Sequence, residues 1–318
     1  MARPRAVAPL PPGPRAVPVS TLDWLLSRED LAARYVTLRD ILGRPEKDIE
    51  RRRAFREVPR DPWVRDVLVL LRKRLAPGWT AAGLSHPYDG VLWQALFLCE
   101  MGLDRRLPEL ERVADVLWAG WERDFVRIDR GEDPVTEPQT LLVVFRTLAA
   151  LGPGDDPRLL SAARWVAERR LGSADAPRGG ASVAPELRFL AAVPAGSRLP
   201  LVERALAFAV ERAIATELPS GRELEPPLLG ALPERHADLL ELLSALAGAG
   251  VTRRPELEPA LALLVHQADR RSRWKLDRGP DGPTWIERER IGELSRWVTV
   301  KALGALSRLT GLTMTGGR

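Results

Sequence analysis

Residues 148–165 read LAALGPGDDPRLLSAARW, and this stretch contains the pattern on which the fold prediction depends. An apolar run ends at Gly152, and glycine is typical of the position just after a helix. A short polar turn follows, and Pro157 then begins a second run. Proline suits the first turn of a helix because its missing N–H is not needed there. The stretch therefore predicts two helices joined by a short turn.

The same pattern recurs along the chain. Leucine-rich runs also end in glycine at Leu38 to Gly43, Leu98 to Gly102, Leu246 to Gly250 and Leu306 to Gly311. Prolines that begin a new helix follow at Pro45, Pro108, Pro157, Pro200 and Pro255. Alignment on the last four places an apolar residue two positions later (Leu110, Leu159, Val202, Leu257) and another eight positions later (Val116, Trp165, Phe208, Leu263). A helical hairpin repeated every 43 to 55 residues or so predicts about six hairpins.

The repeat defines one all-α domain over residues 20–311. Residues 1–19 contain six prolines and three arginines, which favours a disordered arm, and residues 312–318 are expected to form a flexible tail. No alternating strand pattern occurs apart from a possible short β-hairpin across 273–287.

Composition excludes several classes of protein. The 318 residues are 45% hydrophobic, which suffices for a sizeable core. One cysteine excludes a disulfide scaffold and favours a reducing, cytoplasmic setting. A net charge of +5 is too small to imply nucleic-acid binding. No apolar run is long enough for a transmembrane segment, and nothing in the N-terminal arm resembles a secretory signal.

The links between the predicted helices alternate in length. Short turns join the two helices of a hairpin, whereas longer links join one hairpin to the next, at about 76–89, 123–137, 172–182, 218–233 and 270–293. If the first helices form an inner ring and the second helices an outer ring, all long links emerge at one rim. Variable loops gathered at one end of a rigid scaffold are a usual place for a site.

Two stretches of sequence carry a resemblance to a known fold family. Near the start, Trp24-Leu25-Leu26 leads into residues 33–43, ARYVTLRDILG; near the end, residues 273–276, RWKL, precede 284–287, TWIE, and 294–303, LSRWVTVKAL. This arrangement resembles the α/α toroid of terpenoid cyclases and protein prenyltransferases, specifically small bacterial squalene-cyclase-like proteins with a single toroid. The resemblance implies an inner and an outer ring of helices and a central cavity for an isoprenoid-like molecule.

Most motifs for catalysis in such a cavity are absent. No Asp-x-Asp-Asp acid motif occurs, and Asp155-Asp156 before Pro157 is typical of a helix N-cap. Clustered carboxylates for magnesium are missing, and Cys99 is expected to be a small buried residue instead of a zinc ligand. The three histidines His86, His236 and His266 do not fall at metal-ligand spacing. We therefore expect no metal and no cofactor.

Aromatic residues and a few acids near the long links remain as candidates. Indole and phenol rings can stabilise a cation through their faces. The candidate ligand-binding residues are Tyr35, Trp79, Tyr88, Trp93, Trp285 and Trp297, although each could instead pack in the core. The candidate acids and bases are Asp89, Glu287, His236 and Asp238, for which solvated loop charge or helix capping is the alternative.

Three functions remain open from the sequence. The first is the binding or conversion of a hydrophobic, isoprenoid-like small molecule in an aromatic-lined central cavity, by a terpene-cyclase-like enzyme without the usual acid motif. The second is a non-catalytic toroid that serves as a scaffold, with tryptophans filling its centre. The third, nucleic-acid binding by an open helical repeat, is disfavoured by the alternating link lengths.

Overall fold

The computed structural model describes residues 17–75, 81–152, 154–172, 182–219, 228–230, 238–280 and 282–311. The elements are α1 (Val19–Leu26), α2 (Leu31–Val36), the π-helical η1 (Thr37–Ile41), α3 (Ile49–Glu57), η2 (Val58–Arg60), α4 (Pro62–Arg74), α5 (Ala81–Leu84), α6 (Val91–Glu100), α7 (Pro108–Gly120), α8 (Glu122–Asp129), α9 (Pro138–Leu151), α10 (Pro157–Trp165), the π-helical η3 (Val166–Leu171), α11 (Ala184–Ala192), η4 (Ala195–Ser197), α12 (Pro200–Thr216), α13 (Leu239–Gly248), η5 (Pro255–Leu257), α14 (Glu258–His266), β1 (Trp274–Lys275), β2 (Leu294–Ser295) and α15 (Arg296–Thr310). The expected all-α class is confirmed.

Local signals set the helix boundaries. Proline occupies the first turn of α7, α10 and α12, at the positions that the repeat predicts, and Pro255 begins η5 just before α14. Pro45 does not begin a helix: α3 starts at Ile49, because the Asp48 side chain caps it by accepting the N–H of Arg51 at 2.9 Å. Gly102, after α6, has a φ of +82°, which only glycine adopts at little cost.

Two kinds of helix alternate along the chain. In α6, every residue from Val91 to Leu98 is buried, as expected for a helix surrounded by other helices. In α7, burial follows one stripe, Leu110, Val113, Ala114 and Leu117, which is the pattern of a helix with one face in solvent. The sequence therefore distinguishes helices that lie inside from helices that cover them.

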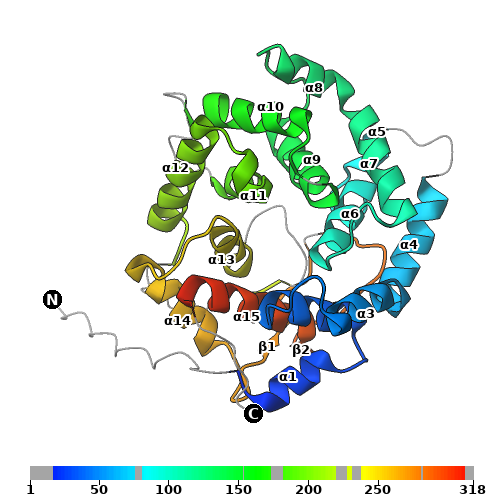
Figure 1. Cartoon of the computed structure of the whole chain (residues 1–318), viewed down its shortest axis with the longest axis vertical. Coiled ribbons are helices and arrows are strands. Elements are labelled where there is room, and N and C mark those ends of the chain that lie inside the picture. Colours follow the sequence, from blue (N-terminus) through cyan, green and yellow to red (C-terminus); the bar gives the residue numbers. More distant parts are fainter. Residues whose placement is uncertain are drawn as a thin grey trace.

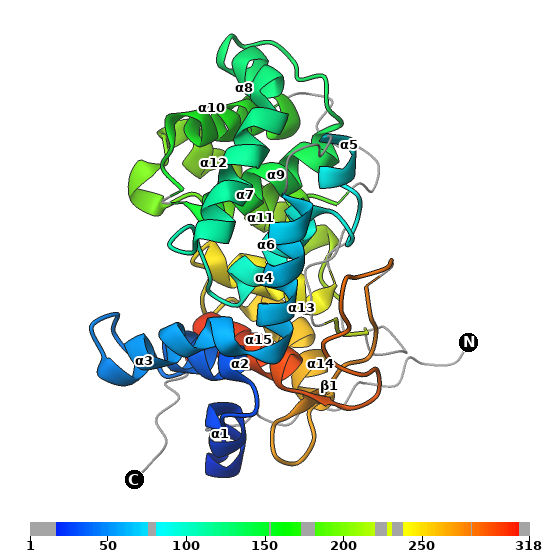
Figure 2. The same cartoon turned by 90° about the vertical axis from the view of Figure 1, so that its right-hand side faces the viewer.

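The inner helices contact one another in succession. Helix α6 contacts α9, α9 contacts α11, α11 contacts α13, and α13 contacts α15. Helix α15 in turn contacts α2 and η1. Figure 1 shows this series towards the inside of the molecule, with α7, α10, α12 and α14 towards the outside. Figure 2, turned by 90°, places α1 and α3 at one end and α8 and α10 at the other.

The expected β-hairpin takes a different register. The strand β1 pairs antiparallel with β2, with Trp274 opposite Ser295 and Lys275 opposite Leu294, so the second strand lies beyond the predicted range 273–287. Trp274 is fully buried and its indole N–H donates to the carbonyl of Leu264 at 2.7 Å. The strand pair thus attaches the segment before α15 to the end of α14.

The tryptophans on the outer helices pack between elements. Trp63, Trp121 and Trp165 are buried, and Trp118 lies beneath the guanidinium of Arg158, 3.5 Å from the centre of its ring. A row of aromatic rings, Trp118, Phe125, Phe145 and Phe189, connects α7 to α11 with ring-centre distances of 4.7, 5.4 and 5.2 Å. These contacts hold the outer helices against the inner ones.

Candidate functional site

A cavity of about 370 Å³ lies at the ends of the inner helices that follow the long links. We call it the linker-side cavity. Its walls come from the segment before α6 and from α6, α9 and α11, mostly from the N-terminal halves of these helices. The lining residues are Ser85, His86, Pro87, Leu92, Trp93, Leu96, Gln139, Thr140, Leu142, Val143, Arg146, Pro185 and Arg188. None of these is an Asp or a Glu. The two arginines among the lining residues are therefore not matched by an acid in the cavity wall, and the rest of the wall combines apolar and neutral polar side chains.

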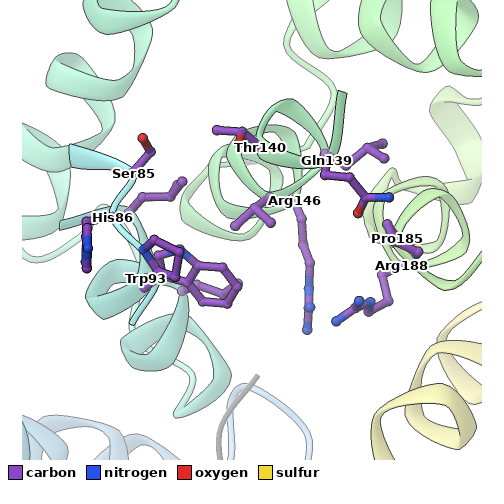
Figure 3. A pocket seen from close by; sticks show the side chains of 13 residues that line it. Ser85, His86, Trp93, Gln139, Thr140, Arg146, Pro185 and Arg188 are labelled. Atoms are coloured by element: carbon purple, nitrogen blue, oxygen red, sulfur yellow. The ribbon is translucent and has the colours of Figure 1, made fainter. Parts of the chain in front are cut away.

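Figure 3 shows how the two arginines are placed. Arg146 comes from α9 and Arg188 from α11, and their guanidinium groups approach each other on one side of the cavity, with the Trp93 ring on α6 beside them. Trp93 itself is buried and packs on Tyr88 and Phe97, at ring-centre distances of 4.9 and 6.4 Å. The cavity thus combines donors at one place with aromatic and aliphatic surface elsewhere.

A cluster of charged side chains behind the arginines connects the inner helices. Glu241 on α13 accepts hydrogen bonds from Arg188 Nη1 at 2.6 Å and from Arg146 Nη1 at 2.9 Å. Arg146 Nη2 also donates to Glu100 on α6 at 2.7 Å, and Lys301 Nζ on α15 lies 3.9 Å from the other oxygen of Glu100. These five residues form what we call the central ion cluster.

The cluster is buried and electrostatically coupled. Burial alone would raise the pKa of Glu241, whose side chain is only 3% exposed, but Arg188, Arg146 and Lys301 together lower it to about 2. For Arg146, burial alone would lower the pKa, but the carboxylates of Glu241 and Glu100 outweigh this effect and raise the pKa. Glu241 and Arg146 are therefore both charged at neutral pH.

A second cavity of about 310 Å³ lies on the other side of the central ion cluster. We call it the turn-side cavity, because it is near the short turns within the hairpins. It is lined by side chains of η1 and the inner helices: Val36, Arg39, Asp40, Leu96, Cys99, Glu100, Arg146, Ala150, Ala192, Ser244, Trp297, Val300, Lys301, Gly304 and Arg308. Since Leu96 and Arg146 line both cavities, the two cavities share a wall.

The predicted aromatic residues are distributed over several places. Trp93 lines the linker-side cavity and Trp297 the turn-side cavity, whereas Tyr35 packs on Phe55 and lines a surface groove beside α3. Tyr88 is buried behind Trp93. The guanidinium carbon of Arg74 lies over Trp285, 4.7 Å from the centre of the indole ring. The indole N–H of Trp285 donates to the carbonyl of Asp89 at 2.7 Å. Trp79 lies outside the described residues.

The predicted acids are not brought together. Asp89 forms an ion pair with Arg74 at 3.4 Å, and Glu287 lines a separate cavity between Leu276 and Ile291. Asp238 caps α13 by accepting the N–H of Glu241 at 2.7 Å and also accepts the N–H of Gly230 at 2.7 Å; burial raises its pKa. His236 lies outside the described residues. Asp238 therefore acts as a helix cap, which is the alternative to a catalytic role that the sequence allows.

Two other sequence expectations can be placed. Asp156 accepts the N–H of Arg158 at 2.9 Å and so caps α10. Burial raises the pKa of the Cys99 thiol, so this cysteine is a poor nucleophile. Among the residues with described positions, no three His, Cys, Asp or Glu side chains gather as potential metal ligands, and no helix is both long and apolar enough to cross a bilayer.

The sequence reasoning missed the central ion cluster. A signal was present, because Arg146, Arg188, Glu241 and Lys301 each interrupt an apolar run (LLVVFRTLAAL, ELRFLAA, LLELLSAL and WVTVKALGAL). A charge within a helix that is buried on most sides must find a partner. Four such interruptions on successive inner helices predict mutual pairing at their common centre.

No protein-family model, no curated protein and no solved structure matches the chain. Function is therefore inferred from the geometry of this chain.

Proposed function

We propose that the linker-side cavity binds a small molecule with an apolar body and a carboxylate head. The observation that carries this proposal is the pair Arg146 and Arg188, which meet at one place in a cavity with no acidic lining residue among those described. A guanidinium has five donors and no acceptor, so the ligand group beside it must accept hydrogen bonds. A carboxylate matches a guanidinium in shape and charge.

The helices add to this preference. The linker-side cavity is lined by residues from the first turns of α6, α9 and α11. The N-terminus of a helix carries a partial positive charge, which favours anions. The apolar walls, from Pro87, Leu92, Leu142, Val143 and Pro185, suit a hydrocarbon chain, and an isoprenoid carboxylate belongs to this class.

The arrangement of the helices is consistent with the suggested α/α toroid, and we propose that architecture. In this proposal the linker-side cavity is the ligand site of the toroid. The lining residues provide no carboxylic acid to protonate an alkene, so we favour binding over cyclisation. Incubation with squalene and prenyl diphosphates, followed by mass spectrometry of the extracts, should return each substrate unchanged; a cyclised product would contradict this preference.

The binding proposal is tested by calorimetric titration of the full-length protein with octanoate, decanoate and geranate, beside decanol as a neutral analogue. We expect the carboxylates to bind and decanol to bind at least about tenfold more weakly, because a hydrogen bond to a charged group contributes roughly 1.5–3 kcal/mol. Equal affinity for decanol, or no binding of any carboxylate, would contradict the proposal.

Two variants locate the site. Arg188→Lys keeps the charge beside Glu241 but removes the planar fork, so carboxylate affinity should fall by about tenfold. Arg198→Lys is the matched control, because Arg198 is similarly buried and lies outside the linker-side cavity. Val143→Trp should abolish binding by filling the cavity. If neither Arg188→Lys nor Val143→Trp changes the affinity, the ligand binds elsewhere.

A further inference from the structure

The turn-side cavity is built differently from the linker-side cavity. Several inner helices contribute a small residue to it, namely Cys99, Ala150, Ala192, Ser244 and Gly304, and these residues leave the space open. Its lining includes four cationic side chains, Arg39, Arg146, Lys301 and Arg308, but only two acids, Asp40 and Glu100. The cavity is thus polar and has an excess of cations.

Lys301 is the most unusual of these cations. Its side chain is 9% exposed, and its ammonium group lies 3.9 Å from Glu100 Oε2, which is longer than a hydrogen bond. Among the described residues, no acceptor forms a hydrogen bond with Lys301 Nζ. Asp238 also attracts this charge, but from beyond ion-pair distance. A nine-tenths buried ammonium with three donors therefore faces the cavity without a close acceptor.

The other charges of the cavity are mostly compensated. Arg39 holds Asp40 through two hydrogen bonds of 2.7 and 2.8 Å, and Arg146 holds Glu100 and Glu241. Arg308 forms no ion pair with a described carboxylate; its Nε donates to the carbonyl of Gly304 at 3.2 Å. Two positive charges, on Lys301 and Arg308, remain after this pairing.

Gly304 lies between these two charged residues on α15. It lies one turn after Lys301 on α15, and a Cβ atom at this position would be 3.5 Å from Nη2 of Arg308. The Arg308 side chain thus folds back along the helix towards Lys301, over a residue that has no side chain. Lys301, Gly304 and Arg308 line the same cavity and, at positions i, i+3 and i+7 of α15, lie on one face of this helix.

We propose that the turn-side cavity binds a phosphate group, either as the free ion or as a small phosphomonoester, between Lys301 and Arg308 above Gly304. Lysine binds phosphate as a compact charge with three donors, and arginine adds a planar pair of donors. A phosphate group supplies acceptors in several directions, which suits donors that approach from two sides. This site is separate from the carboxylate site proposed above, because Lys301, Gly304 and Arg308 line the turn-side cavity and not the linker-side cavity.

Titration calorimetry of the full-length protein at low salt tests the proposal, with inorganic phosphate, glycerol 3-phosphate and succinate as probes. We expect saturable binding of one inorganic phosphate or one glycerol 3-phosphate per chain. Tighter binding of inorganic phosphate would identify the free ion as the ligand, and tighter binding of glycerol 3-phosphate would identify a phosphomonoester. Lys301→Met should weaken binding by at least about tenfold, since a charge-assisted contact is lost. Lys275→Met is the matched control, because this exposed lysine on β1 does not line the cavity.

Two further variants keep the test decisive if Lys301→Met does not fold. Arg308→Gln changes a solvent-exposed side chain and should also weaken phosphate binding. Gly304→Ala should weaken it without lowering the melting temperature, because the added methyl group occupies the proposed site and meets only an ordinary contact. Val143→Trp should leave phosphate binding unchanged while abolishing carboxylate binding, so the two proposals fail independently.

Four outcomes would overturn this assignment. They are the absence of phosphate binding to the wild-type protein, an equal loss in Lys275→Met and Lys301→Met, tighter binding of succinate than of either phosphate compound, and loss of phosphate binding in Val143→Trp.

Discussion

The two cavities share Arg146 and Leu96 but occupy opposite halves of the same helices. The linker-side cavity receives residues from the N-terminal halves of α6, α9 and α11, and the turn-side cavity receives residues from their C-terminal halves. Because a helix is positive at its N-terminus and negative at its C-terminus, cations are intrinsically favoured on the turn side and disfavoured on the linker side. Arg39, near the end of η1, and Arg308, in the last turn of α15, follow this preference; Lys301 and Arg188, in the second turns of α15 and α11, oppose it.

The difference shows what Glu241 does for the fold. A guanidinium that is largely buried between helices needs a carboxylate to compensate its charge, and Glu241 compensates both Arg146 and Arg188. The linker-side cavity therefore depends on a residue that does not line it. The turn-side cavity keeps its excess charge without an equivalent carboxylate.

The largest effect is expected when Glu241 loses its charge. Glu241→Gln leaves two buried guanidinium groups without their shared partner, and breaking a buried ion pair in this way costs about 3–5 kcal/mol of unfolding free energy. Urea denaturation at neutral pH measures the loss. Glu211→Gln is the control, because Glu211 pairs with Arg254 at the surface and its removal should have a much smaller effect. Similar losses in the two variants would show that the central ion cluster has no special role.

Acidification should reproduce part of this effect in the wild-type protein. The pKa of Glu241 falls from its ordinary value of 4.5 to about 2 on folding, so the folded state binds this proton less readily than the unfolded state. The corresponding stabilisation, roughly 3 kcal/mol, is fully present above about pH 4.5 and is lost as the pH falls towards 2. The difference in unfolding free energy between wild type and Glu241→Gln should be constant from pH 7 to 5 and shrink below that range. A difference that stays constant down to pH 3 would contradict this assignment.

The sequence was sufficient for the parts of the fold that depend on neighbouring residues. Pro108, Pro157 and Pro200 mark helix starts because a proline acts on its own turn, and the alternation of buried and half-buried helices follows from side-chain periodicity. Where a second local signal competes, the prediction fails: the cap from Asp48 overrides Pro45. Gly152 ends α9 in an extended conformation, and the left-handed residue is Gly154.

The centre of the molecule was not predictable in the same way. The sequence suggested an aromatic-lined hollow, whereas the structure places a cluster of charges between two cavities, with Trp93 and Trp297 on opposite sides of it. Arg146 and Glu241 are 95 residues apart in the chain, so no local pattern relates them. Asp89 and Glu287 lie in or next to long links, and this position in the sequence predicts the end of the molecule at which they lie but not the direction in which their side chains point.

The smallest expected effect concerns Gly304 and sharpens the contrast between the cavities. A glycine inside a helix costs up to about 1 kcal/mol relative to alanine, so Gly304→Ala should raise the unfolding free energy by up to that amount, since the new Cβ meets nothing closer than 3.5 Å. Gly102→Ala is the control: the same change at a φ of +82°, with a Cβ only 2.4 Å from Cε1 of Tyr35, should destabilise the protein. Urea denaturation of both variants gives the signs. A gain at position 304 would mean that folding alone does not require glycine there, as expected if the open space serves a ligand; a loss would mean that α15 needs this glycine for packing.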